Sequence, residues 1–201
     1  MDAWLTDWRG RYTGRALALA SPASTAEVAA LARLCAAHGV PIVPQGGNSG
    51  MAGGATPDAS GTAIILSLRR MDAIRSLNAE AGQIVCEAGV ILQTLHDAAD
   101  AAFMRFPLTL GGKGSATIGG LISTNAGGTQ VLRHGTMRAQ VLGLEAVLAS
   151  GVTCGMMWRS CRWRPRWPGN WRGPAGACTC MTRTGPTAWA PPCRCRRVHP
   201  P

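Results

Sequence analysis

The amino-acid sequence predicts an α+β fold with two lobes across residues 1–151, followed by a tail, residues 152–201, without a fold of its own. Three observations support this prediction. Apolar residues recur at strand and helix periods only in the first part of the chain. Two segments crowded with glycine interrupt that part, and the composition changes abruptly after Gly151.

Short apolar segments bounded by turn residues predict the strands. The first lobe is expected from Ala16 to Leu68 and the second from Ile74 to Gly151. The expected strands are Ala16–Ala20, Pro41–Pro44, Ala63–Leu68, Ile84–Ala88 and Val141–Ala149. The strand from Pro41 should lead directly into the first glycine-rich segment.

Two segments have the period of helices. Ser24-Thr25-Ala26-Glu27 is a capping box, in which Glu27 is expected to reach back to the backbone N–H of Ser24. Apolar residues then recur at helical spacing up to Gly39, a stop signal. A second helix is expected over Val90–Ala102, and its inward side chains are those of Leu92, Leu95 and Ala99.

The glycine-rich segments, Val43–Gly54 and Leu110–Gly128, carry the functional signal. Glycine permits positive φ and the close approach of a ligand to the backbone. Consecutive N–H groups in such a loop form a concave nest that attracts phosphate. Two nests predict a long, doubly charged ligand such as a dinucleotide, whereas the alternative is a pair of surface turns. Neither segment has the spacing of a Rossmann fingerprint or a P-loop.

The sequence around these segments resembles a known family. The residues that carry the resemblance are Trp8-Arg9-Gly10-Arg11-Tyr12, ALALASPASTAEVAALARLCAAHGVPIVPQGGNSGMAGGATPD, FPLTLGGKGSATIGG and STNAGGTQVLRHG. They resemble the FAD-binding, PCMH-type domain of the vanillyl-alcohol-oxidase superfamily. Within it they are similar to the FAD-linked D-2-hydroxyacid dehydrogenases, which include D-lactate and D-2-hydroxyglutarate dehydrogenases. The small departures, such as His134 where the family often has tyrosine, remove no glycine.

The resemblance implies which residues contact FAD. In the first loop, around the pyrophosphate, they are Gly46, Gly47, Asn48, Ser49 and Gly50. In the second, along the ribityl chain and flavin ring, they are Pro107, Gly114, Ser115, Gly119, Gly120, Thr124, Asn125 and Gly127. Superfamily members with covalent flavin often have a histidine near the position of Asn48. No histidine lies between Pro41 and Gly61, so FAD is expected to be bound without a covalent link. Without the resemblance, Asn48 is equally well a turn residue that tolerates positive φ.

Other reactive residues are expected to have ordinary roles. Cys35 and Cys86 lie in apolar patterns and are interpreted as buried small hydrophobic residues. His38 is expected to cap a helix end, and His96 to be solvated. Nothing in the sequence marks Glu87 and Glu145 as an acid–base pair, and no catalytic or metal-binding residue is predicted.

The tail has a composition unlike the rest of the chain. It contains nine arginines and no acidic residue, and so contributes +9 to the net charge of +10. It also lacks leucine, isoleucine and phenylalanine, so it is expected to be disordered. Its arginines and tryptophans suggest nucleic-acid binding, and Cys178, Cys180, Cys193, Cys195 and His199 suggest zinc. We favour a third interpretation, a shifted reading frame that begins near Gly151 or Val152.

The resemblance implies an FAD-binding oxidoreductase fragment. The intact parent would oxidise a D-2-hydroxyacid of the D-lactate, D-2-hydroxyglutarate or glycolate class, by hydride transfer to flavin N5, and would use an electron acceptor. The family's substrate domain supplies the catalytic residues, so this incomplete chain is expected to be inactive. The alternative is a non-enzymatic basic protein that binds nucleic acid or zinc through the tail; the preferred interpretation includes no nucleic-acid partner.

The expected location is the cytoplasm. Asp2 and Asp7 lie where a secretory signal would be apolar, and no segment has the length of a transmembrane helix. Two sparse cysteines before the tail fit a reducing compartment. Peripheral association with a membrane is left open, because family members often pass electrons to quinones.

Overall fold

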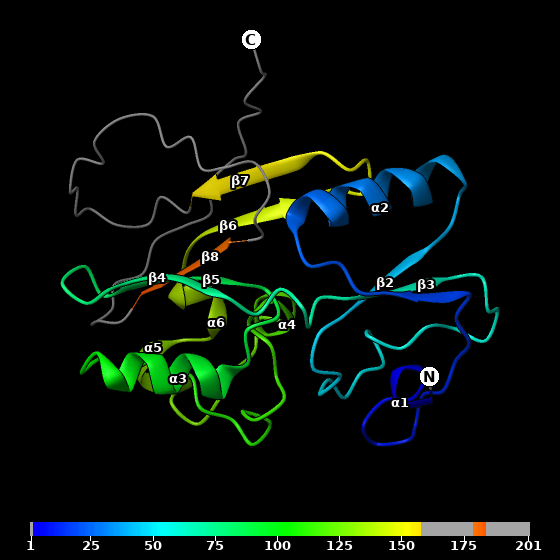
Figure 1. Cartoon of the computed structure of the whole chain (residues 1–201). Coiled ribbons are helices and arrows are strands. Elements are labelled where there is room, and N and C mark those ends of the chain that lie inside the picture. Colours follow the sequence, from blue (N-terminus) through cyan, green and yellow to red (C-terminus); the bar gives the residue numbers. More distant parts are fainter. Residues whose placement is uncertain (1, 158–178, 184–201) are drawn as a thin grey trace, which may run out of the picture.

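The structure, a computed structural model, describes residues 2–157 and 179–183 (Figure 1). Its helices are α1 (Asp2–Leu5), α2 (Thr25–Ala37), α3 (Leu92–Ala101), α4 (Ile118–Ser123), α5 (Val131–His134) and α6 (Met137–Gln140). Its strands are β1 (Ala18–Ala20), β2 (Ile42–Gln45), β3 (Ile64–Ser67), β4 (Ile74–Asn78), β5 (Gln83–Glu87), β6 (Val141–Val147), β7 (Thr153–Met157) and β8 (Thr179–Arg183). Two sheets confirm the α+β prediction.

The first sheet is parallel and small, with strand order β1-β3-β2. Parallel strands need crossover connections, and α2 is the connection between β1 and β2. The central strand β3 is almost wholly buried, since Ile65, Leu66 and Ser67 are at most 6% exposed. The chain after β2 forms bends rather than a helix, which excludes a Rossmann arrangement at the first glycine loop.

The capping box of α2 is formed with one difference. The Ser24 hydroxyl accepts a hydrogen bond from the Glu27 N–H at 3.2 Å, as predicted. The Glu27 carboxylate, however, accepts from the N–H of Ala23 at 2.8 Å, and not from Ser24. The carboxylate thus holds the residue before the cap, which fixes the direction from which the chain enters the helix.

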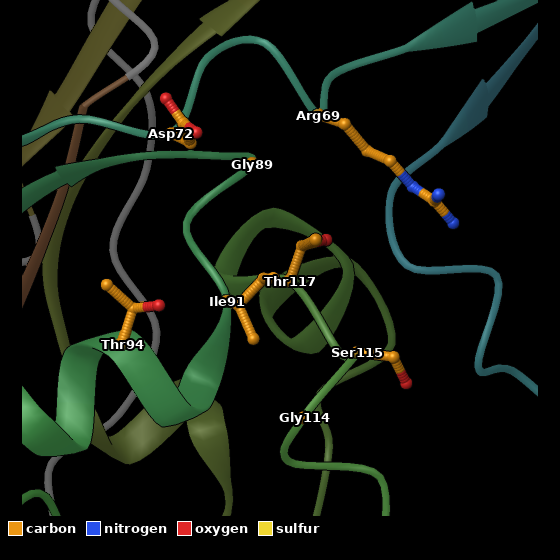
Figure 2. A pocket seen from close by; sticks show the side chains of 8 residues that line it. All are labelled: Arg69, Asp72, Gly89, Ile91, Thr94, Gly114, Ser115 and Thr117. Carbon is orange, nitrogen blue, oxygen red and sulfur yellow. The ribbon is translucent and has the colours of Figure 1, made fainter.

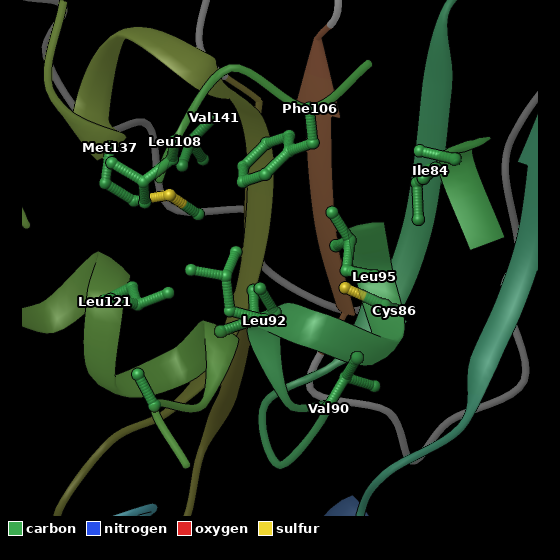
Figure 3. Close-up of a cluster of buried hydrophobic side chains, with 13 residues drawn as sticks. Ile84, Cys86, Val90, Leu92, Leu95, Phe106, Leu108, Leu121, Met137 and Val141 are labelled. Carbon is green, nitrogen blue, oxygen red and sulfur yellow. The ribbon is translucent and has the colours of Figure 1, made fainter. Parts of the chain in front are cut away.

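The second sheet has the order β4-β5-β8-β6-β7 and its strand pairs are antiparallel. Helix α3 and the loop after it cover this sheet, and their apolar side chains form the main core (Figure 3). Leu92, Leu95 and Ala99 are fully buried, which confirms the predicted face of the helix. Cys35 and Cys86 are also buried, as expected.

Two segments of the tail, which was expected to have no fold of its own, form strands in the structure. Thr153–Met157 pairs with β6 through a hairpin in which Gly151 has φ +75°. Thr179–Arg183 lies between β5 and β6. Strand pairing uses backbone groups, so a segment without leucine or isoleucine can still complete a sheet. The remaining tail positions, including Cys178, Cys193, Cys195 and His199, lie outside the described residues.

The His96 side chain is more enclosed than the sequence predicted, although it stays partly exposed. Its Nε2 lies 2.9 Å from the Leu108 carbonyl oxygen, at hydrogen-bonding distance, and its ring centre is 6.1 Å from that of Phe106. The loop after α3 therefore packs against the imidazole. His38 is the C-cap residue of α2, as predicted.

Among residues 2–157 and 179–183, no helix is both long enough and apolar enough to cross a membrane.

Candidate cofactor-binding site

The two glycine-rich segments approach each other closely. A Cβ atom on Gly47 would lie 2.6 Å from the carbonyl carbon of Ser115, and a Cβ on Gly46 would lie 3.2 Å from the Cβ of Thr117. Ordinary contacts of a Cβ atom begin at about 3.4 Å. Only glycine therefore allows the first loop to approach the second this closely, and the predicted residues Gly46, Gly47 and Ser115 are brought together.

The first loop presents unused hydrogen-bond donors. Within the described part of the chain, no partner is found for the backbone N–H groups of Gly47, Asn48, Ser49 and Gly50. These four residues are partly or fully exposed, so their N–H groups can be reached by a ligand. A Cβ on Gly50 or on Gly114 would meet no atom within 4 Å, so both glycines face open space. The loop is therefore a nest that fits an anionic ligand.

A cleft of about 270 Å³ lies beside the second glycine loop, where the chain passes from the first lobe to the second (Figure 2). Its lining residues come from the segment after β3, the segment around β5 and α3, and the second glycine loop. They are Arg69, Asp72, Gly89, Ile91, Thr94, Gly114, Ser115 and Thr117. Gly114 and Ser115 were predicted as site residues; the others were not.

Thr117 and Arg69 are polar side chains of this cleft that sequence reasoning missed. The Thr117 hydroxyl is buried and has no partner among the described residues. A buried hydroxyl without a hydrogen bond is costly, so this atom fits a polar ligand. The Arg69 guanidinium donates from Nε to the Gly46 carbonyl at 3.0 Å and brings a positive charge to the first loop. The position of Thr117 between the predicted residues Ser115 and Gly119 could have identified it from the sequence, whereas no sequence pattern marks Arg69.

Asn48 and Asn125 both have positive φ, at 51° and 49°. The Asn48 side chain donates from Nδ2 to the Thr6 carbonyl at 2.8 Å and thus binds the N-terminal segment. The Asn125 side chain accepts a hydrogen bond from the Arg138 N–H at 3.0 Å. Each side chain thereby fixes a turn, which is the simpler role considered for Asn48 from the sequence.

The other predicted residues lie along α4 or behind it. Thr124 donates its hydroxyl to the Gly120 carbonyl at 2.8 Å, and Gly127 lies beside Val131. Gly119 packs tightly against Ala88, and its N–H donates to the Ala88 carbonyl at 2.8 Å. Pro107 is buried next to the core residues Phe106 and Leu108. Pro107 and Gly119 are therefore part of the packing that supports the loops.

Glu87 and Glu145 have structural roles. The Glu87 carboxylate pairs with Arg75 at 2.5 Å and accepts from the Ala73 N–H at 3.0 Å. Glu145 accepts a hydrogen bond from the Thr25 hydroxyl at 3.2 Å. Among the described residues, no group of three or more His, Cys, Asp or Glu side chains could hold a metal ion. The geometry of the site is that of a binding cradle for an anionic group.

Known proteins share much of this chain's sequence. The chain is 43% identical over 151 residues to a probable mitochondrial D-2-hydroxyglutarate dehydrogenase of rice (Oryza sativa subsp. indica), covering 75% of this chain and 27% of that protein. It is 44% identical over 146 residues to the bovine (Bos taurus) mitochondrial D-2-hydroxyglutarate dehydrogenase, covering 73% and 26%. The chain thus spans about a quarter of the length of these relatives.

Solved structures have the same fold. The 6-hydroxy-D-nicotine oxidase of Arthrobacter nicotinovorans superposes with a TM-score of 0.68 at 25% identity, over 78% of this chain and 33% of that one. An alkyldihydroxyacetonephosphate synthase superposes with a TM-score of 0.66 at 19% identity, over 86% and 34%. At this identity, the similarity to the synthase shows a shared fold only.

The expected cytoplasmic location is contradicted by these relatives. The rice, Arabidopsis thaliana and bovine proteins are all named as mitochondrial. The low number of cysteines before the tail was one basis of the expectation, and it does not distinguish one reducing compartment from another.

The protein family described as "FAD binding domain" matches residues 16–155 of this chain. These residues include both glycine loops and all the residues that line the cleft. The resemblance inferred from the glycine-rich segments is confirmed, and the chain belongs to the family of FAD-binding domains.

Proposed function

We propose that this chain binds FAD non-covalently, with the pyrophosphate on the first glycine loop. The observation that carries the proposal is the row of four N–H groups from Gly47 to Gly50, unpaired within the described part of the chain, beside the Arg69 guanidinium. Backbone donors and a nearby cation are the groups that bind phosphate oxygens. The Thr117 hydroxyl offers a further polar contact.

The second loop would hold the remainder of the cofactor. Gly114, Gly120, Thr124, Asn125 and Gly127 are all exposed and lie on or next to α4. The glycines among them have no side chain, which would let a flat ring system approach the backbone. When bound, FAD supplies an acceptor for a hydride, and the residues of this chain bind it and fix its orientation.

The reaction of a longer protein with this domain would be the oxidation of a small D-2-hydroxyacid. The relatives named above are D-2-hydroxyglutarate dehydrogenases, and a protein of Schizosaccharomyces pombe that is 38% identical over 153 residues is named a putative D-lactate dehydrogenase. The chain covers 28% of the latter. No described residue of this chain is assigned a catalytic role, so the chain is proposed to bind cofactor without catalysing the oxidation.

Titration of the purified full-length chain with FAD, followed by flavin fluorescence, tests the proposal. Gly50→Ala and Gly114→Ala each place a methyl group in open space beside the site and should leave the fold unchanged. Each variant is expected to weaken binding about tenfold, equivalent to about 1.4 kcal/mol. Gly155→Ala, on β7 and equally open, is the matched control and should bind FAD like the wild type.

Two results would contradict the proposal. If the folded wild-type chain does not bind FAD, the cradle does not have this function. If Gly50→Ala and Gly114→Ala bind as tightly as the control, the cofactor lies elsewhere. Acid precipitation should release free FAD into the supernatant, and flavin retained on the protein would show that the link is covalent.

A further inference from the structure

The N-terminal segment, residues 3–14, precedes the matched FAD-binding region and nevertheless contacts the first glycine loop. We call this segment the N-terminal strap. Gln45, at the end of β2, donates from its side-chain amide to the Trp4 carbonyl at 3.0 Å. Asn48 donates to the Thr6 carbonyl at 2.8 Å. Residues on either side of Gly46 and Gly47 are thus bound to the strap.

The Trp4 side chain reaches the loop through Arg69. The Arg69 guanidinium lies over the Trp4 ring, 4.5 Å from the ring centre, and also donates to the Gly46 carbonyl. A cation over the face of a tryptophan ring is held there by electrostatic attraction, a cation–π interaction. Because the guanidinium is planar and held on one face, its orientation toward the first loop depends on Trp4.

The strap has its own internal anchor. The Asp7 carboxylate accepts from the N–H groups of Arg11 and Tyr12 at 2.7 and 2.8 Å, which closes a turn. These backbone donors, that of Tyr12 above all, hold the pKa of Asp7 below its usual value. The turn places the Tyr12 ring against Gly53, where a Cβ would lie 2.8 Å from the ring. The far end of the first loop is therefore covered as well.

The first loop needs such support because few hydrogen bonds of its own hold its shape. The N–H groups from Gly47 to Gly50 have no partner within the described part of the chain, so no backbone ladder stiffens them. Glycine also has more conformational freedom than other residues. The contacts that define the shape of the first loop are its approach to Ser115 and Thr117 on one side and to the strap on the other.

We infer that the strap preorganises the first glycine loop for its ligand, with Trp4 and Asn48 as positioning residues. The effect on affinity rests on the proposed binding of FAD, whereas the effect on loop order does not. A loop already held in its binding shape loses less entropy when the ligand arrives. Residues outside the matched region would thus contribute to cofactor affinity without touching the cofactor.

The test uses backbone order parameters from nitrogen-15 NMR relaxation on the full-length chain, measured for Gly46 to Gly50 without ligand. In the wild type these should be about 0.85, the value of a rigid backbone, and in Trp4→Ala they should fall below about 0.6. Trp4→Phe keeps an aromatic face for Arg69 and should restore most of the order. FAD affinity, measured in parallel, should fall about tenfold in Trp4→Ala and recover in Trp4→Phe.

Trp8→Ala is the matched control. Trp8 lies in the same strap and also has an arginine, Arg9, over its ring at 5.3 Å, but it is 60% exposed. Among the described residues, no hydrogen bond or cation–π contact joins it to the first loop. Its replacement should change neither loop order nor FAD affinity. Asn48→Asp is a second variant, which tolerates positive φ but cannot donate to Thr6, and it should disorder the loop like Trp4→Ala.

The outcomes separate the two proposals. Unchanged order parameters at Gly46 to Gly50 in both Trp4→Ala and Asn48→Asp would overturn the inference, and so would equal loss of order in Trp8→Ala. Loss of order in the two variants, in a chain that binds no FAD, would support the strap and contradict the proposed function. A fall in order throughout the chain would mean that the strap supports the whole fold, which also overturns the inference.

Discussion

Replacing Gly47 with alanine should force the two glycine loops apart. The new methyl carbon would lie 2.6 Å from the Ser115 carbonyl carbon and closer still to its oxygen. Ordinary contacts begin near 3.4 Å, so the backbones must separate by at least about 0.8 Å. Overpacking of this kind costs about 1–3 kcal/mol. In a chain of this size that lowers the thermal midpoint by roughly 2–12 °C.

The neighbouring Gly46 provides a comparison that sharpens this test. Its added methyl group would meet the hydroxyl of Thr117, a side chain, so Gly46→Ala combined with Thr117→Ala should recover part of the lost stability. Gly47→Ala combined with Ser115→Ala should recover none, because the obstacle is backbone. Urea denaturation followed by circular dichroism measures all four variants. A Gly47→Ala variant within about 0.5 kcal/mol of wild type would refute the close approach.

Three further changes test other parts of the fold. Leu95→Ala, at a fully buried position, should lower the free energy of unfolding by about 2–5 kcal/mol in urea denaturation, and an effect below about 1 kcal/mol would contradict the core. Glu87→Gln weakens the contacts to Arg75 and Ala73 and should lower the free energy of unfolding by about 1–2 kcal/mol. An unchanged free energy of unfolding at neutral pH would mean that the ion pair between Arg75 and Glu87 is not formed. The pKa of Asp7 is lower in the folded chain than its ordinary value of 3.8, so the carboxylate stabilises the fold above pH 3.8. This stabilisation is lost as the pH falls through the pKa of the folded state. In Asp7→Asn, the free energy of unfolding should therefore depend less steeply on pH on the acid side. An unchanged dependence in an acid titration would contradict the turn that Asp7 closes with Arg11 and Tyr12.

The elements predicted from sequence were those with strong periodicity. Helix α3 and its buried leucines followed from spacing alone, because an amphipathic helix repeats its inward positions regularly. Strand β4 was missed because its residues are mostly exposed and include Arg75 and Ser76. Strand β8 was missed because its place depends on backbone pairing with two strands distant in sequence.

The candidate site was predictable where it depends on glycine. Gly46 and Gly47 were identified because a segment crowded with glycine allows a close backbone approach that few other segments permit. Arg69 and Thr117 were not, since one arginine and one threonine are ordinary at any surface, and only the fold shows that both line the same cleft. The bonds of Asn48 to the N-terminal strap were equally invisible, because the bond to Thr6 joins residues 42 positions apart.

The contact between the two lobes has a consequence for how a ligand enters and leaves. Helix α2 of the first lobe is fastened to the second, through the Thr25 hydroxyl on Glu145 and the Arg33 guanidinium on the Gly151 carbonyl at 3.2 Å. Val147 of β6 also packs with Val28, Leu66 and Met71 in one apolar cluster. A hinge opening of the lobes would have to break these hydrogen bonds and separate this apolar cluster. We therefore expect a ligand to enter and leave the cleft through local motion of the glycine loops, and the rate of that motion would then set its residence time.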